Sequence, residues 1–158
     1  MSKTTPVIFD DGTVEYFFWA YDVALAVLFA HAIRIADRVP ASARCAGHDE
    51  LVADMKVQIE IGASSAVILD SYERELLRTF RSWLAEACDQ LTDRGGVWAT
   101  EYRELGFPDR RHFRGAEHIE PGPMIDIAIA IGQLLDGNLP PAPDGSHWFI
   151  GTGRITTC

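Results

Sequence analysis

Hydrophobic and polar positions along this chain of 158 residues repeat mainly with the period of a helix. Residues 16–36 form a long, mostly apolar stretch in which Asp22, His31 and Arg34 are the only Asp, Glu, His, Lys or Arg residues. These three fall within one half of a helix that turns by 100° per residue, and the other half is apolar. Because an aspartate lies near its start, the pattern favours an amphipathic helix at the centre of a water-soluble fold over a membrane span.

A second helix is predicted over residues 71–91, where apolar residues follow the 3–4 spacing and Asp70 with Glu73 forms a capping-box-like start. Residues 49–60 favour a helix as well. The alternation at 56–61 and the apolar run at 66–69 keep a strand open for residues 55–69.

Two further helices are predicted toward the C-terminus, a short one over 97–105 and an apolar one over 124–136. Alternating isoleucines leave a strand as the alternative for 124–132. Residues 6–10 and 147–155 are predicted to be extended and to pair as a hairpin or small sheet. We therefore expect a mainly α, single-domain helical bundle spanning residues 1–158, with four to five helices and a minor β element from the termini.

The composition is that of a globular chain, with 47% hydrophobic residues and a net charge of −9. Such an acidic chain repels phosphate backbones and anionic membrane surfaces, so we expect neither nucleic acid nor a membrane as its partner. The three cysteines form no disulfide or zinc-binding pattern, which together with the missing signal peptide favours a cytoplasmic protein. The sequence identifies no cofactor, and no metal ligands are assigned.

Asp22 and His31 are the candidate catalytic residues. A carboxylate among apolar neighbours is costly to bury, and its pKa is expected to rise unless an arginine pairs with it. The alternative is a structural role, in which Asp22 lies at the edge of the polar half of its helix and hydrogen-bonds a neighbouring element.

The densest polar segment covers residues 110–120. Arg111, His112, Arg114 and His118 are candidate ligand-binding residues there, since arginines suit an anion or an acidic loop of a partner. The histidines with Glu117 and Glu120 would be a metal-binding alternative, although their spacing matches no compact ligand pattern. A charged surface loop with no ligand is the simplest interpretation.

Two functions from different classes follow. The first is an acidic partner-binding protein that neutralises a basic protein, similar to immunity proteins and antitoxins in charge and size only. The second is a small-molecule enzyme or ligand-binding protein with an aromatic pocket in the bundle, using Asp22, His31 and the 110–120 loop, with aromatic walls such as Trp19. Core packing is the alternative role of these aromatics. A homodimer is compatible with either function.

Overall fold

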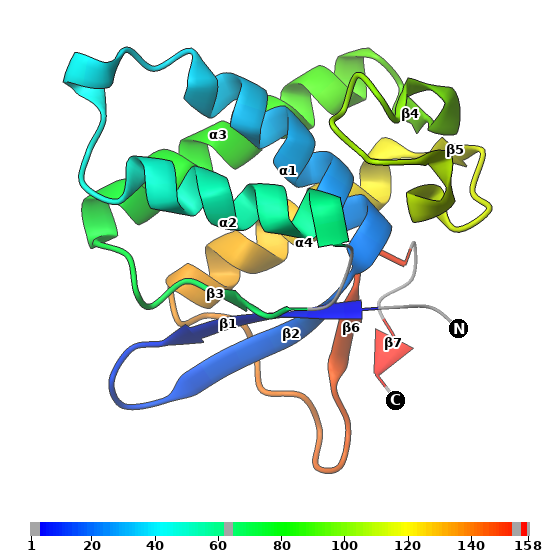
Figure 1. Ribbon diagram of the computed structural model, residues 1–158. Helices are drawn as coiled ribbons and strands as arrows, with labels where there is room; N and C mark the ends of the chain where they lie inside the picture. Colours follow the sequence, from blue (N-terminus) through cyan, green and yellow to red (C-terminus); the bar gives the residue numbers. More distant parts are fainter. Residues whose placement is uncertain (1–3, 62–64, 153–155, 158) are drawn as a thin grey trace.

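A computed structural model describes residues 4–61, 65–152 and 156–157 of the chain. It consists of a mixed five-stranded sheet with four helices on one face of it and no helix on the other within the described ranges (Figure 1). The helices are α1 (Asp22–Asp37), α2 (His48–Ile61), α3 (Arg74–Asp93) and α4 (Pro121–Leu135). The strands of the sheet are β1 (Thr4–Asp10), β2 (Glu15–Tyr21), β3 (Val67–Ile68), β6 (Trp148–Ile150) and β7 (Thr156–Thr157).

The strands lie in the order β3-β1-β2-β6-β7. β1 and β2 form an antiparallel hairpin, while β3 runs parallel to β1 and β6 parallel to β2. In the turn of the hairpin, Gly12 has a φ of +89° and its N–H donates to Asp10 Oδ1 over 2.7 Å. A glycine suits this position because residues with a side chain rarely adopt a positive φ.

A second, two-stranded sheet lies beside the ends of the helices (Figure 1). It pairs β4 (Val97–Trp98) with β5 (His118–Ile119). Short 3-10 helices complete the described elements: η1 (Ala41–Ala43), η2 (Ala99–Glu101) and η3 (Arg110–Phe113).

The expected helical bundle is wrong, because the sheet is a full layer of the fold and not a minor addition from the termini. The protein is an α/β fold. The largest error concerns residues 16–36, whose first part is strand β2 and whose remainder is helix α1. Tyr16 to Tyr21 are mostly aromatic, and aromatic side chains favour strands. Asp22 does not lie on a polar helix face but in the first turn of α1, where a carboxylate interacts favourably with the helix dipole.

α1 also differs from the expected amphipathic helix. It is central and buried on nearly all sides, with Arg34 and Asp37 as its exposed residues. α4, expected to be fully buried, instead exposes 55% of Ile129.

Of the other predicted elements, some are confirmed and some are wrong. The helix predicted over 49–60 is confirmed as α2, the apolar run at 66–69 contains β3, and the helix over 124–136 is confirmed as α4. The helix over 97–105 is wrong, since β4 and η2 occupy its start. The capping box is also wrong, because Glu73 itself is the N-cap of α3.

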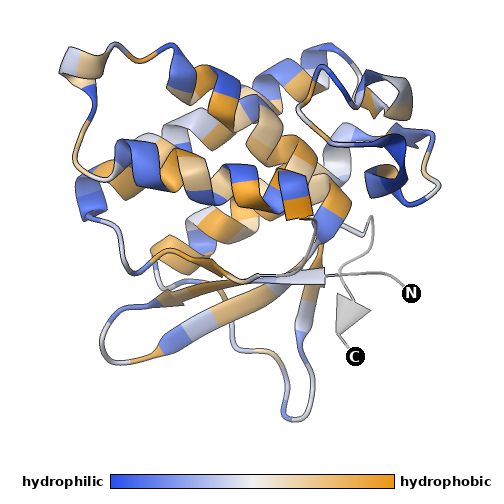
Figure 2. Ribbon diagram, in the orientation of Figure 1, coloured by the Kyte–Doolittle hydropathy of each residue, from blue (hydrophilic) through white to orange (hydrophobic). Residues whose placement is uncertain are grey.

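The core lies between the two layers. The inward residues of the hairpin, Val7, Phe18 and Ala20, are fully buried against the helices, and α4 and α1 both contact β2. Hydrophobic residues continue from the strands into the helices above them (Figure 2). Among the described residues, no helix is both long and apolar enough to cross a membrane.

Candidate functional site

The outer face of the sheet, which no described helix covers, carries a set of aromatic and aliphatic side chains. Successive residues of a strand point to opposite faces, so the neighbours of the buried Val7, Phe18 and Ala20 point outward. The register places Ile8 opposite Phe17, and Trp19 between Pro6 and Phe149. Exposed apolar side chains in one contiguous row are typical of an interaction surface.

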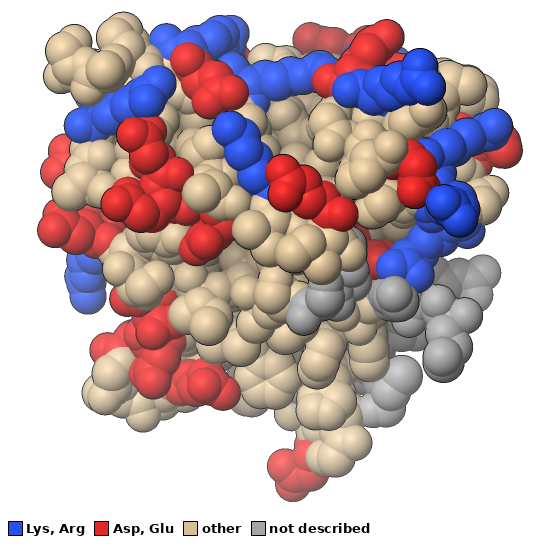
Figure 3. Space-filling model, in the orientation of Figure 1, with Lys and Arg blue, Asp and Glu red and all other residues tan. Residues whose placement is uncertain are grey.

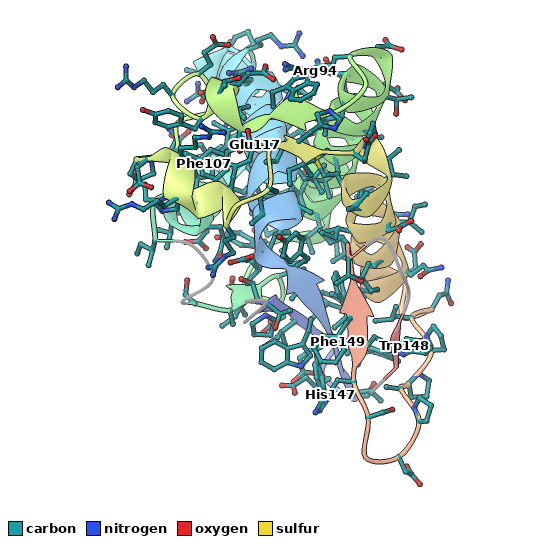
Figure 4. The ribbon with its side chains drawn as sticks, turned by 90° about the vertical axis from the view of Figure 1, so that its right-hand side faces the viewer. Arg94, Phe107, Glu117, His147, Trp148 and Phe149 are labelled. Carbon is teal, nitrogen blue, oxygen red and sulfur yellow. The ribbon has the colours of Figure 1, made fainter. Side chains whose placement is uncertain are left out.

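The rings of this face contact one another across the strands. The His147 ring lies 5.9 Å from the Phe17 ring and 6.4 Å from the Trp19 ring, measured between centroids. His147 directly precedes β6, whose residues Trp148 and Phe149 lie on opposite sides of the strand (Figure 4). Phe17 keeps 38% of its surface exposed and Ile68, on β3, keeps 50%. We call the outward side chains of Pro6, Ile8, Phe17, Trp19, Ile68, His147 and Phe149 the aromatic face.

Trp19 has a further unusual feature on this face. Its indole Nε1 is buried, yet it donates no hydrogen bond to any residue within the described ranges. A buried indole N–H usually finds an acceptor. Trp19 was expected to bind a ligand, and the structure places it at the centre of the aromatic face instead of in a helical pocket.

Acidic residues border one end of the aromatic face. Asp10 and Glu15 are direct cross-strand partners on the outward side, next to the Ile8–Phe17 pair. Asp11 lies in the turn beyond them, where its Oδ1 accepts from the hydroxyl and the N–H of Thr13 and from the N–H of Val14. These hydrogen bonds lower the pKa of Asp11, so its charge persists into the acidic range.

Basic residues are confined to the other layer. Of the described residues, every Lys and Arg lies between positions 34 and 114, and none lies in β1, β2, β3, β6 or the loop that leads to β6. In the space-filling view, blue side chains spread over the helical half, while the sheet half of this face shows only red and tan atoms beside the undescribed grey residues (Figure 3). The strands and the turn that form the aromatic face and its rim therefore contribute only negative charge among the described side chains. Arg74, at the start of α3, lies beside this rim: it lines a groove together with Asp10 and Asp11, and its charge helps to lower the pKa of Asp11.

The structure brings together one pair of the residues expected from the sequence. The carboxylate of Asp22, with 4% of its side chain exposed, binds the guanidinium of Arg114, with 2.6 Å between Oδ2 and Nη2. Its other oxygen accepts the N–H of Val23 over 2.8 Å. Arg114 follows η3 and has a φ of 52°, a conformation that costs energy for a residue with a side chain. Burial, and next the Asp22 carboxylate, raise the pKa of the neighbouring Tyr21.

This ion pair fastens the loop after η3 to the first turn of α1. Breaking a buried ion pair leaves one charge without compensation, so such a pair holds its two segments together. Asp22 was expected to need an arginine partner, and Arg114 is that partner. Because the pair joins two segments of the chain, we interpret it as structural.

His31 lies apart from Asp22, nine residues further along α1 and therefore about 13 Å along the helix axis. It is 2% exposed, and neither ring nitrogen hydrogen-bonds within the described part of the chain. Burial lowers the pKa of His31 to about 4; the amide of Gln90 beside the ring opposes the shift without reaching hydrogen-bonding geometry. His31 is therefore neutral at pH 7.

The other candidates of the 110–120 segment are engaged locally. Arg111 points into solvent, 91% exposed, with Asp109 3.6 Å away. The ring nitrogens of His112 lie 3.3 Å from the backbone carbonyl oxygens of Asp109 and Glu60, which joins η3 to the end of α2. The His118 ring packs against the exposed Trp98 ring, tilted by 41°, with 4.5 Å between centroids.

The carboxylates of the same segment also have partners. Glu117 binds Arg110, and Glu120 lies 3.2 Å from Nδ1 of His118. Across the described ranges, no group of three or more His, Cys, Asp and Glu side chains is arranged to hold a metal ion. The segment is a surface loop whose charged side chains pair mostly with one another.

Neither Asp22 nor His31 lines any of five main grooves formed by the described residues. Two of these grooves, of about 730 Å³ each, lie at the hairpin. One of these runs along β2 and includes Phe17 and His147, so it borders the aromatic face. The residues expected to form one pocket thus lie in separate places.

Comparison with known proteins adds no family to this description. No family model, no curated protein and no solved structure matches the chain.

Sequence reasoning missed most of the aromatic face, including Phe149, His147, Ile8 and the acidic partner Glu15. The signal that was available is Asp11-Gly12, a dipeptide favoured in hairpin turns, between two apolar stretches. It marks a hairpin, and a hairpin makes the alternate residues of both strands neighbours on one face.

Proposed function

We propose that this protein binds a basic protein partner through the aromatic face of its sheet. The observation that carries the proposal is the combination, on one surface, of exposed rings with strands and a turn whose charged side chains in the described ranges are all acidic. Aromatic residues that become fully desolvated contribute most of the binding free energy in many interfaces. Phe17, Trp19 and Phe149 are the anchors that we assign to this role.

The acidic rim indicates that the partner's contacting surface is basic. Asp10, Asp11 and Glu15 lie at the hairpin end of the face, and complementary charge speeds association and selects partners. A second copy of the chain fits less well, because both copies would bring a net charge of −9. Nucleic acid is disfavoured for the same reason.

Occlusion of a basic partner's working surface would neutralise that partner. This is the role that acidic charge and small size favour, and it is the form of the proposal that we prefer. The small-molecule alternative has no comparable observation behind it, since its residues do not share a groove.

The test starts from untagged protein isolated from its own host, with any bound protein identified by native mass spectrometry. The affinity of the purified pair is then measured for the native chain, for Phe17→Ala and for Ile129→Ala. Ile129 is a matched control, because it is an even more exposed apolar residue on the helical layer. We expect Phe17→Ala to weaken binding by about 2 kcal/mol, which is about thirtyfold, and Ile129→Ala to leave it unchanged.

Salt provides the second arm of the test. The association rate should fall by about tenfold or more when ionic strength rises from low to high, because charge steers the encounter. A bound protein without excess positive charge, a self-associated dimer, or equal effects of the two variants would overturn the proposal.

A further inference from the structure

A groove of about 730 Å³ runs between β2 and the loop that connects α4 to β6. Its lining includes Glu15, Tyr16 and Phe17 from the strand and Pro140, His147 and Trp148 from the loop and the start of β6. The groove exists because β6 pairs with β2 only at Trp19 and Ala20, so the chain before β6 diverges from the strand. It continues the aromatic face at its acidic end.

The walls of the groove are held in place by specific contacts. Trp148 donates its indole N–H to the carbonyl oxygen of Pro140 over 2.7 Å. Ser146 donates both its N–H and its hydroxyl to the carbonyl oxygen of Pro143. Leu139 anchors the loop in the core with only 7% of its surface exposed. A groove that is ordered before binding loses less entropy when it is filled.

The chemistry of the lining favours a cation. The Phe17 and His147 rings lie 5.9 Å apart between centroids and are tilted by 48°, and the ring faces of Phe, Tyr and Trp attract a guanidinium or ammonium group. Glu15 supplies the one carboxylate of the lining, and this carboxylate forms no ion pair with another residue of the described ranges. No Lys or Arg lines the groove.

We infer that this groove accepts an arginine side chain of the basic partner. A planar guanidinium stacks on aromatic rings and forms two parallel hydrogen bonds to a carboxylate, whereas an ammonium group offers only a point charge. In the bound state the guanidinium stacks on Phe17 and donates to the Glu15 carboxylate. This inference rests on the proposed function, and it names the side chain that the site selects.

The test uses two peptides, acetyl-Gly-Gly-Arg-Gly-Gly-amide and the same peptide with citrulline in place of arginine. Citrulline keeps the shape of arginine and lacks its charge. Each is titrated into the ¹⁵N-labelled chain, and the amide chemical shifts are followed. We expect the arginine peptide to shift the amides of residues 14–17 and 138–148 and to bind about tenfold more tightly than the citrulline peptide.

Two variants isolate the carboxylate. Glu15→Gln should lower the affinity for the arginine peptide by about tenfold and leave the weak affinity for the citrulline peptide unchanged. Glu75→Gln makes the same charge change at an exposed position of α3 and should have no effect. The dispersion of the amide spectrum reports directly whether each variant is folded.

Several outcomes would overturn the inference: equal affinity for the two peptides, equal effects of the two variants, shifts centred on the helical layer, or no saturable shift at millimolar peptide. Its failure is distinguishable from that of the proposed function. If Phe17→Ala weakens binding of the protein partner but Glu15→Gln does not, the aromatic face binds the partner and the groove holds no arginine. If the peptide binds as expected but Phe17→Ala leaves the partner's affinity unchanged, the proposed function fails alone.

Discussion

The helical layer and the aromatic face differ in how their exposed charged side chains are paired. On the helices and the small second sheet, arginines meet carboxylates: Arg81 pairs with Asp136 through both nitrogens, at 2.7 and 3.2 Å, and Arg38 pairs with Glu86. On the outer side of the sheet, Asp10 lies directly opposite Glu15, and like charges in this position destabilise a sheet. The two regions lie at opposite ends of the molecule (Figure 4).

Exposed apolar residues are arranged differently in the two regions. Several rings gather on the aromatic face, whereas the large exposed apolar residues of the helices and the small second sheet, Ile61, Trp98 and Ile129, lie on three different elements. A surface that combines repelling charges with uncovered rings lowers stability, and such surfaces are typical of binding sites. The comparison therefore assigns a structural effect to the helical layer and binding to the sheet.

The sharpest contrast concerns two neighbouring residues of one strand. Phe18→Ala should lower the free energy of unfolding by about 3–5 kcal/mol, because Phe18 is fully buried between the layers. Phe17→Ala should lower it by about 1 kcal/mol or less, since it removes only contacts on the outward face, with Ile8 and His147. Urea denaturation measures both. Equal losses would mean that the outward face is covered.

The next largest loss of stability is expected from breaking the buried ion pair between Asp22 and Arg114. Arg114→Ala should lower the free energy of unfolding by about 3 kcal/mol, because it leaves the buried Asp22 carboxylate without its partner. Arg111→Ala is the control from the same segment, and with 91% of its side chain exposed it should change stability by less than about 0.5 kcal/mol. A negligible effect of Arg114→Ala would show that Asp22 does not depend on this pair.

His31 makes the helical layer sensitive to pH. Its folded-state pKa of about 4 lies below the ordinary value of 6.5, so protons bind the unfolded chain better and stability falls as pH drops through this window. Between pH 7 and pH 5 the loss should be about 2 kcal/mol. His31→Leu should remove this loss, as measured by denaturation at both pH values. A pH dependence unchanged in the variant would exclude His31 as its cause.

The smallest expected effect is an increase in the free energy of unfolding. Glu15→Gln removes the repulsion from Asp10 and should raise the free energy of unfolding by about 0.5 kcal/mol. Glu75→Gln on α3 should give no comparable gain. If Glu15→Gln instead destabilised the chain, the acidic rim would contribute to stability and its assignment to binding would lose its physical basis.

The sequence predicts the helices more accurately than the sheet. α2 follows from the spacing of its apolar residues, and α4 follows from an apolar stretch that begins after Pro123. The need of Asp22 for an arginine follows from the cost of a buried carboxylate. The partner itself, Arg114, lies 92 positions further along the chain and could not be chosen from several arginines. Long-range pairing of this kind depends on the fold.

β2 escaped prediction for a different reason. Its inward and outward residues are both aromatic or apolar, so no polar alternation marks it as a strand, and the same residues also fit one half of a helical wheel. The aromatic face joins positions 6, 8, 17, 19, 68, 147 and 149, which only the order of the strands brings together. Local periodicity contains no information on that order.

The most direct measurement is amide hydrogen exchange of the chain, alone and saturated with the basic protein that co-purifies with it. We expect new protection in β2 and over residues 147–150, with helices α2 and α3 and the 110–120 loop unchanged. Protection confined to the helices or to that loop, with β2 exchanging as in the free chain, would contradict the assignment of binding to the aromatic face.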